Sequence, residues 1–148
     1  MELDPRVHVS QDDLVQQRDL ALQIVRGMKS SYDAFEKVAA LHAALTERKK
    51  ATKAPDKLDA LEKKVESLQK GTKRWPGFGP INRDLGRLIS SVESADIRPS
   101  QAVRAAVQQL CDQLDKNLQQ FQNVNNQDVP ALNIKSAGTT LPKSGCGE

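Results

Sequence analysis

The sequence predicts an all-α protein, an antiparallel three- to four-helix bundle with one long first helix, a broken return leg and a short C-terminal helix. Apolar residues recur at helical spacing along residues 14–45, and three later segments repeat that pattern. Aromatic residues make up 3% of the 148 residues and hydrophobic residues 38%, so leucine, valine, isoleucine and alanine must form the core. Such a composition suits helix packing better than a β-sandwich, and the length is that of one domain.

The first helix is expected from about Gln11 to about Lys50. Ser10 is a favourable N-cap, and Asp13 completes a weak capping box. Gly27 interrupts the interior at a cost of about 1 kcal/mol relative to alanine. The apolar stripe consists of two rows and their neighbours: Leu14, Ala21, Met28 and Phe35; Ile24, Val38 and Leu45; Val25, Tyr32 and Ala39.

A broken return leg is expected to follow. Its first helix begins near Pro55 and ends at about Lys70, before Gly71. Its second helix covers about 81–95, after an irregular segment in which two prolines and two glycines forbid a continuous helix. Residues 56–95 match the first helix in length, so they can lie antiparallel along it.

A fourth helix is expected to follow a tight connection at 96–100 and to run to about Asn125. The amide-rich residues 123–127 are interpreted as a fraying helix end. Asp128 is expected to cap a short last helix, with Pro130 near its start and Gly138 past its end. The predicted organisation is a strand-like junction at 1–9, a helical bundle at 10–138 and a mobile tail at 139–148.

Composition argues against several classes of protein. The net charge of +3 is weaker than that of a dedicated nucleic-acid binder, so nucleic acid is an unfavoured partner. No apolar run is long enough to span a membrane, and no signal-peptide pattern follows Met1. Cys111 lies in a predicted helix and Cys146 in the Gly-rich C-terminal segment, and the spacing of Cys and His residues does not match a zinc site. We therefore expect two free thiols.

No catalytic, metal-binding or cofactor-binding constellation is predicted. His42 falls on the apolar side of the first helix and is expected to be a partly buried histidine, and His8 has no predicted partner. The acids Asp12, Asp13 and Asp19 lie near a helix N-terminus, where they favour the helix dipole.

The most concentrated charge lies in residues 48–74, with ten Lys or Arg residues against four acids. A solvated helical hairpin is the leading interpretation, and a surface for an anionic partner is the alternative. The loop at 75–80 is either a recognition loop or a linker whose two aromatic rings fill the end of the core, and we favour the linker. The candidate interaction surface comprises Lys49, Lys50, Lys53, Lys73, Arg74, Trp75 and Phe78.

Three groups of residues at the predicted helix boundaries carry a family resemblance. They are Asp4-Pro5-Arg6-Val7 with Ser10, Asp13-Leu14 and Gln17; Ile81-Asn82 with Leu85, Leu88, Ala95-Asp96, Pro99-Ser100 and Gln101; and Asp128 with Val129-Pro130-Ala131-Leu132-Asn133 and Gly138. In order and spacing they resemble the C-terminal helical domain of bacterial BNR/Asp-box (sortilin-like) β-propeller proteins, often labelled glycosyl hydrolases.

The resemblance implies an extracytoplasmic accessory domain that follows a small β-sandwich in a larger secreted protein. Hydrolase chemistry would belong to the propeller, and no catalytic residue is carried over, because this chain contains no Asp-box. The basic hairpin, the Trp75 loop and the segment around Cys146 depart from the family pattern.

Three hypotheses follow. The first is a non-catalytic helical accessory domain that packs against the rest of its parent chain or mediates protein association. The second is a stand-alone module that binds an anionic partner through the basic hairpin at 48–74. The third is a homo-oligomer in which copies share the apolar stripe of the first helix.

Overall fold

Every regular element in the described part of the chain is helical, which confirms the predicted all-α class. The computed structural model describes residues 9–52, 56–94, 97–134 and 144–146. The elements are α1 (Gln11–Lys50), α2 (Asp56–Lys70), α3 (Phe78–Glu93), α4 (Gln101–Asn123), a π-helical segment η1 (Val124–Asp128) and α5 (Val129–Ala131). The predicted strand-like junction falls almost wholly on residues 1–8, outside the described ranges.

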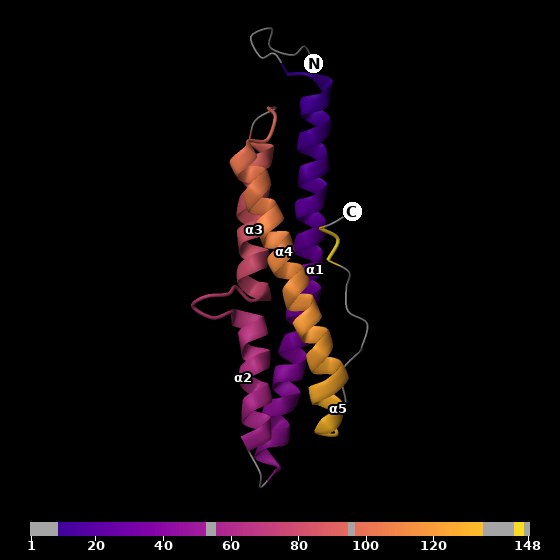
Figure 1. The fold of residues 1–148 in the computed structure, drawn as a ribbon, viewed down its shortest axis with the longest axis vertical. Coiled ribbons are helices and arrows are strands. Elements are labelled where there is room, and N and C mark those ends of the chain that lie inside the picture. Colours follow the sequence, from indigo (N-terminus) through magenta and orange to yellow (C-terminus); the bar gives the residue numbers. More distant parts are fainter. Residues whose placement is uncertain (1–8, 53–55, 95–96, 135–143, 147–148) are drawn as a thin grey trace.

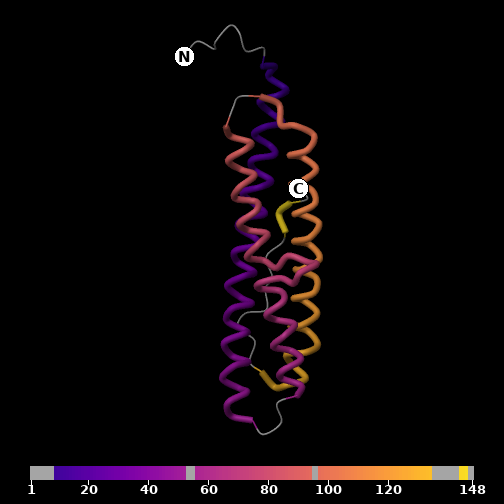
Figure 2. The backbone as a smooth tube through the Cα atoms, turned by 90° about the vertical axis from the view of Figure 1, so that its left-hand side faces the viewer, coloured from indigo at the N-terminus to yellow at the C-terminus, as the bar shows by residue number. Residues whose placement is uncertain are grey.

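The bundle is a long rod built on α1. Figure 1 shows α2 and α3 lying end to end beside α1. Helix α4 crosses the face that these helices share and completes the rod. Helix α1 contacts α2, α3 and α4, and α4 also contacts α2 and α3. The broken return leg is therefore confirmed, and α4 runs back down the bundle toward the α1–α2 end (Figure 2).

The buried face of α1 follows a regular alternation of four and three residues, as in a coiled coil. Its members are Leu20, Ile24, Gly27, Ser31, Ala34, Val38, Leu41 and Leu45, and Ser30 is buried beside them. Ile24, Val38 and Leu45 were predicted in this face, whereas the row of Leu14, Ala21, Met28 and Phe35 lies on its flank. Leu14 is 36% exposed and the other three are partly buried. The other helices of the same chain cover this face, so no second copy is needed to bury it.

Local chemistry explains where the helices begin. Ser10 and Asp13 form the predicted capping box, in which the Ser10 hydroxyl accepts the Asp13 N–H at 3.1 Å. Helix α3 begins at Phe78, three residues before the predicted start. Pro80 does not prevent this, because the N–H groups of a first helical turn have no acceptor within the helix.

The C-terminal end differs most from the prediction. Asp128 has helical backbone angles and makes no capping hydrogen bond, so the chain continues from α4 through η1 into α5 without the predicted break. A π-helix accommodates one extra residue per turn. As a result Val124 and Val129, five residues apart, both face the core. Asn133, with φ of 50°, follows the helical segment, while the predicted stop at Gly138 lies outside the described residues.

Candidate functional site

The predicted basic surface at the α1–α2 hairpin is largely neutralised. The Lys49 ammonium lies 2.5 Å from Asp59 Oδ1 and 2.9 Å from Glu62 Oε2. Asp59 Oδ1 meets Lys49 as an ion pair without good hydrogen-bond alignment. Lys50 pairs with Glu47 at 2.7 Å. The acids of α2 therefore neutralise Lys49, and Glu47 of α1 itself neutralises Lys50, so these two lysines carry little surplus charge for a partner.

Electrostatic coupling at this hairpin is visible in the pKa values. The neighbouring Asp59, and then Glu62, raise the pKa of Lys49 above its ordinary value. Contact with Lys49 lowers the pKa of Glu62. His42 is partly buried, as expected. Its Nε2 lies 3.8 Å from Glu62 Oε1, so this histidine has an acidic neighbour on α2. Lys53 of the candidate surface lies outside the described residues.

The loop between α2 and α3, residues 71–77, is held in one shape by its own backbone. The Thr72 N–H donates to the Trp75 carbonyl at 2.7 Å. The Thr72 hydroxyl accepts the N–H groups of Arg74 and Trp75 at 3.3 and 3.1 Å. Gly71, with φ of 86°, sits at the end of α2, and a Cβ there would lie 2.8 Å from the Trp75 carbonyl oxygen. The loop thus needs glycine at this position and closes tightly on itself.

Helix α4 anchors this loop through a buried amide. Asn117, only 1% exposed, accepts the Trp75 indole N–H at 2.7 Å and donates to the Pro76 carbonyl at 2.9 Å. The Lys116 ammonium lies 5.2 Å from the centre of the Trp75 ring, within cation–π distance. No sequence motif pairs Asn117 with Trp75, because 42 residues separate them.

Phe78 must be removed from the candidate surface. It is fully buried and packs edge-on against Phe121, with ring centres 6.4 Å apart. The favoured prediction that this aromatic pair fills the core is therefore confirmed for Phe78 and holds in part for Trp75, which is partly buried. Lys73 and Arg74 are exposed, as a surface role requires.

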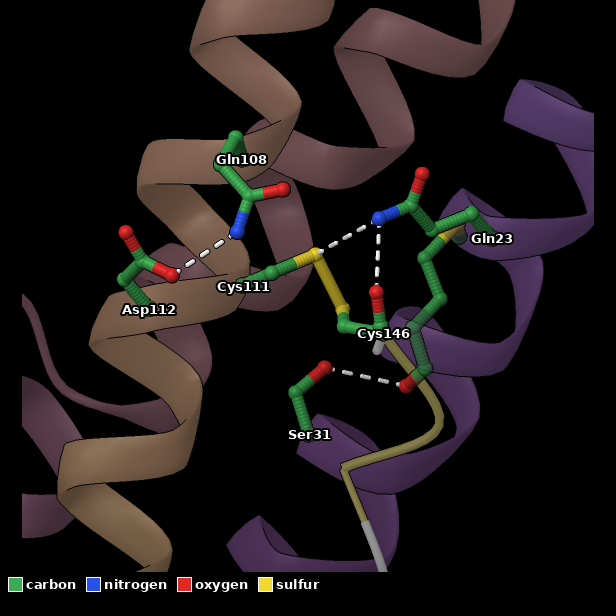
Figure 3. Close-up of a disulfide and its surroundings, with 7 residues drawn as sticks. Gln23, Ser31, Gln108, Cys111, Asp112 and Cys146 are labelled. Atoms are coloured by element: carbon green, nitrogen blue, oxygen red, sulfur yellow. Dashed lines mark hydrogen bonds between the residues drawn. A yellow bond between two sulfur atoms is a disulfide. The ribbon is translucent and has the colours of Figure 1, made fainter. Parts of the chain in front are cut away.

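The expectation of two free thiols is wrong, because Cys111 and Cys146 form a disulfide. Figure 3 shows the bond joining α4 to the C-terminal segment beside α1. The Gln23 amide of α1 donates to the Cys146 carbonyl at 2.6 Å and approaches Cys111 Sγ at 3.8 Å. Sequence reasoning could not predict this pairing, because the two cysteines are 35 residues apart and no motif links them.

The disulfide also bears on the C-terminal segment and on Gly27. Cys146 is 3% exposed, so residues 144–146 of the predicted mobile tail are fastened to the bundle, while 139–143 and 147–148 lie outside the described ranges. Gly27 is more than an interruption of α1, since a Cβ there would lie 2.7 Å from Cys146 Sγ. Glycine at this position makes room for the disulfide.

The amide-rich segment forms one wall of a surface cleft instead of a fraying end. The cleft has a volume of about 290 Å³ and is lined by Ser67 and Leu68 of α2 and by Gln120, Asn123 and Gln127. Lys64 and Asp128 also line it and form an ion pair at 3.1 Å. The π-helical turn thus brings Asp128 to α2, where the acid bridges two helices instead of capping one.

Large apolar side chains remain exposed toward the N-terminal half of the rod. They are Leu14 at 36%, Val15 at 38%, Leu22 at 46%, Val25 at 52% and Tyr32 at 56% on α1, with Ile97 at 57% in the α3–α4 connection. Arg98 of that connection bonds Gln16 at 3.0 Å, which places Ile97 near the start of α1. Several exposed apolar side chains in one region are typical of an interaction surface.

Within the described ranges, no group of three or more His, Cys, Asp or Glu residues could hold a metal ion. Asp13 serves the capping box, where hydrogen bonds from Ser10 lower its pKa, and Asp19 pairs with Arg18. His8 lies outside the described residues. None of the described helices combines the length and the apolar character that crossing a membrane requires.

Comparisons with known proteins found no matching family model, no matching curated protein and no matching solved structure.

Proposed function

We propose that this chain is a non-catalytic C-terminal helical accessory domain of a larger secreted BNR-repeat, glycosyl-hydrolase-like protein. Its role is to pack against a neighbouring part of the parent chain or to mediate protein association. The observation that carries the proposal is the group of exposed apolar residues at the N-terminal half of the rod, Leu14, Val15, Leu22, Val25 and Ile97. Burial of such side chains against another protein surface is favourable by about 25 cal/mol per Å².

The position of these residues supports packing against a domain that precedes α1. They lie on the first four turns of α1 and on the α3–α4 connection at the same end of the rod. Figure 1 shows that α1 extends past the other helices at this end of the rod. A domain joined to the N-terminus of α1 would meet these side chains first.

The disulfide supports an extracytoplasmic location for the parent protein. Disulfides form and persist in secreted and periplasmic proteins and are rare where cytosolic reductants act. Cys111 and Cys146 are 2% and 3% exposed, and Gln23 holds the Cys146 carbonyl at 2.6 Å. A buried bond with its own polar anchor fits a permanent cross-link better than a transient one.

Reading the genomic frame upstream of this segment tests the proposal. We expect the frame to continue into Asp-box repeats and a signal peptide. A stop codon and a ribosome-binding site immediately upstream would refute the accessory-domain assignment.

Light scattering over a range of concentrations tests the rival occupant of the apolar region, a second copy of this chain. We expect the mass of one chain, 16.3 kDa, at every concentration. If the mass doubles and Leu22→Glu with Val25→Glu restores the monomer, the region is a self-association surface instead.

A further inference from the structure

We propose that the 71–77 loop, together with Lys116 of α4, is a docking knob for an acidic peptide segment of a partner protein. This inference goes beyond the proposed packing role, because the loop lies about half-way along the rod, between α2 and α3 (Figure 1). The apolar residues of that packing role lie toward one end. The two surfaces can therefore engage different partners.

Surplus positive charge gathers at this loop. Lys73, Arg74 and Lys116 are exposed, and none of them forms an ion pair within the described residues. The neighbouring Lys70 is different, because Glu66 neutralises it at 2.9 Å. Asp112 lies one turn before Lys116 on the same face of α4, but its carboxylate accepts the Gln108 amide at 2.9 Å and forms no ion pair with Lys116 in the described part of the chain.

The loop is organised before any partner binds. Hydrogen bonds centred on Thr72 fix its backbone, and the buried Asn117 amide ties both Trp75 and Pro76 to α4. A linker that only joined α2 to α3 would not require a buried amide of a third helix. A fixed loop presents Lys73 and Arg74 with little loss of conformational entropy on binding, which strengthens association.

Shape and chemistry favour a peptide carboxylate over a nucleic acid. One face of the Trp75 ring already holds the Lys116 ammonium, and the indole N–H is bonded to Asn117. The ring is therefore poorly placed to stack between nucleobases, which single-stranded nucleic-acid binders require. The loop projects from the side of the rod in Figure 1, so it suits insertion among Asp and Glu side chains of a partner.

The single tryptophan makes the inference directly testable, because Trp75 is the chain's only one and lies within the proposed site. We would titrate the chain with a short Asp/Glu-rich peptide and follow tryptophan fluorescence. We expect a saturable change that weakens as salt concentration rises. Lys73→Glu with Arg74→Glu should weaken binding at least about tenfold, since two attractive charges become repulsive.

A matched control is available on α2. Lys57→Glu with Lys63→Glu makes the same change in net charge at two exposed lysines outside the loop, and its affinity should stay within about twofold of wild type. Circular dichroism checks that each variant is folded. Lys116→Glu gives a second reading from the surface of α4, should the loop variant fail to fold.

Three results would overturn the inference. One is the absence of a saturable fluorescence change with the wild-type chain. Another is equal weakening by the loop and control variants, which would assign the effect to net charge alone. A third is binding to heparin, lost in the loop variant, without binding to the peptide. None of these readouts depends on the identity of the parent protein, so they leave the accessory-domain proposal untouched.

Discussion

Removal of the disulfide should destabilise the bundle by a predictable amount. The bond closes a loop of 35 residues between Cys111 and Cys146. In the chain-entropy model, such a cross-link restricts the unfolded chain and contributes about 4 kcal/mol to the free energy of unfolding at 25 °C. For a chain of this size that loss lowers the melting temperature by about 8–16 °C.

Thermal and urea unfolding followed by circular dichroism would measure this loss for Cys146→Ala. Wild-type protein treated with a dithiol reductant should show a similar shift, whereas the reductant should leave Cys146→Ala unchanged. Agreement between the two separates loss of the bond from loss of the cysteine side chain. Ser144→Ala, two residues away in the same segment, is the matched control and should melt as wild type does.

Two results would refute this reasoning. The first is a wild-type melting temperature that the reductant does not change after complete reduction is verified. The second is labelling of both cysteines by a thiol reagent in unfolded, unreduced protein. Either would mean that the C-terminal segment does not depend on a covalent link to α4.

Three further predictions concern the core, the loop anchor and the hairpin. Leu61→Asp should abolish cooperative unfolding by circular dichroism, because Leu61 is 3% exposed and burial of a charge there is unfavourable. Leu110→Asp should cost less, since Leu110 is only partly buried. Asn117→Ala should shift Trp75 fluorescence to the red and lower the free energy of unfolding by about 1–3 kcal/mol, and an unchanged spectrum would contradict the anchoring role. Glu62→Gln should be less stable than wild type at pH 7, with the difference closing as pH falls below 4.5. The sign follows because Lys49 lowers the folded-state pKa of Glu62 below its ordinary value of 4.5, so the carboxylate stabilises the fold above that pH and ceases to as it protonates. Urea titrations across this pH range would measure the difference, and a gap that does not vary with pH would argue against the ion pair.

Helical periodicity made most of the fold predictable. The bounds of α1 follow from the Ser10 capping box and from an apolar pattern that continues to Leu45. Periodicity could not decide which of two adjacent rows faces the core, because rows at neighbouring angles both look apolar. The row containing Ile24 faces inward since the other helices cover it, and the row containing Leu14 remains on the flank.

The features that sequence reasoning missed depend on contacts between distant residues. Cys111 and Cys146 become neighbours only after α4 has packed on α1. Asn117 meets Trp75 only after α4 has packed against the loop between α2 and α3, and the acids of α2 meet Lys49 only when α2 has folded back along α1. No local motif predicts the extra residue of the π-helix. Because of it, Asp128 forms an ion pair with Lys64 and does not cap the last helix as predicted.

Immunoblotting of fractionated source cells with an antibody against this chain tests the central claim most directly. The account predicts a polypeptide far larger than 16.3 kDa in the extracytoplasmic fraction, with Cys111 and Cys146 protected from thiol reagents until reduction. A polypeptide near 16 kDa in the cytoplasm, with both thiols reactive on unfolding, would contradict it.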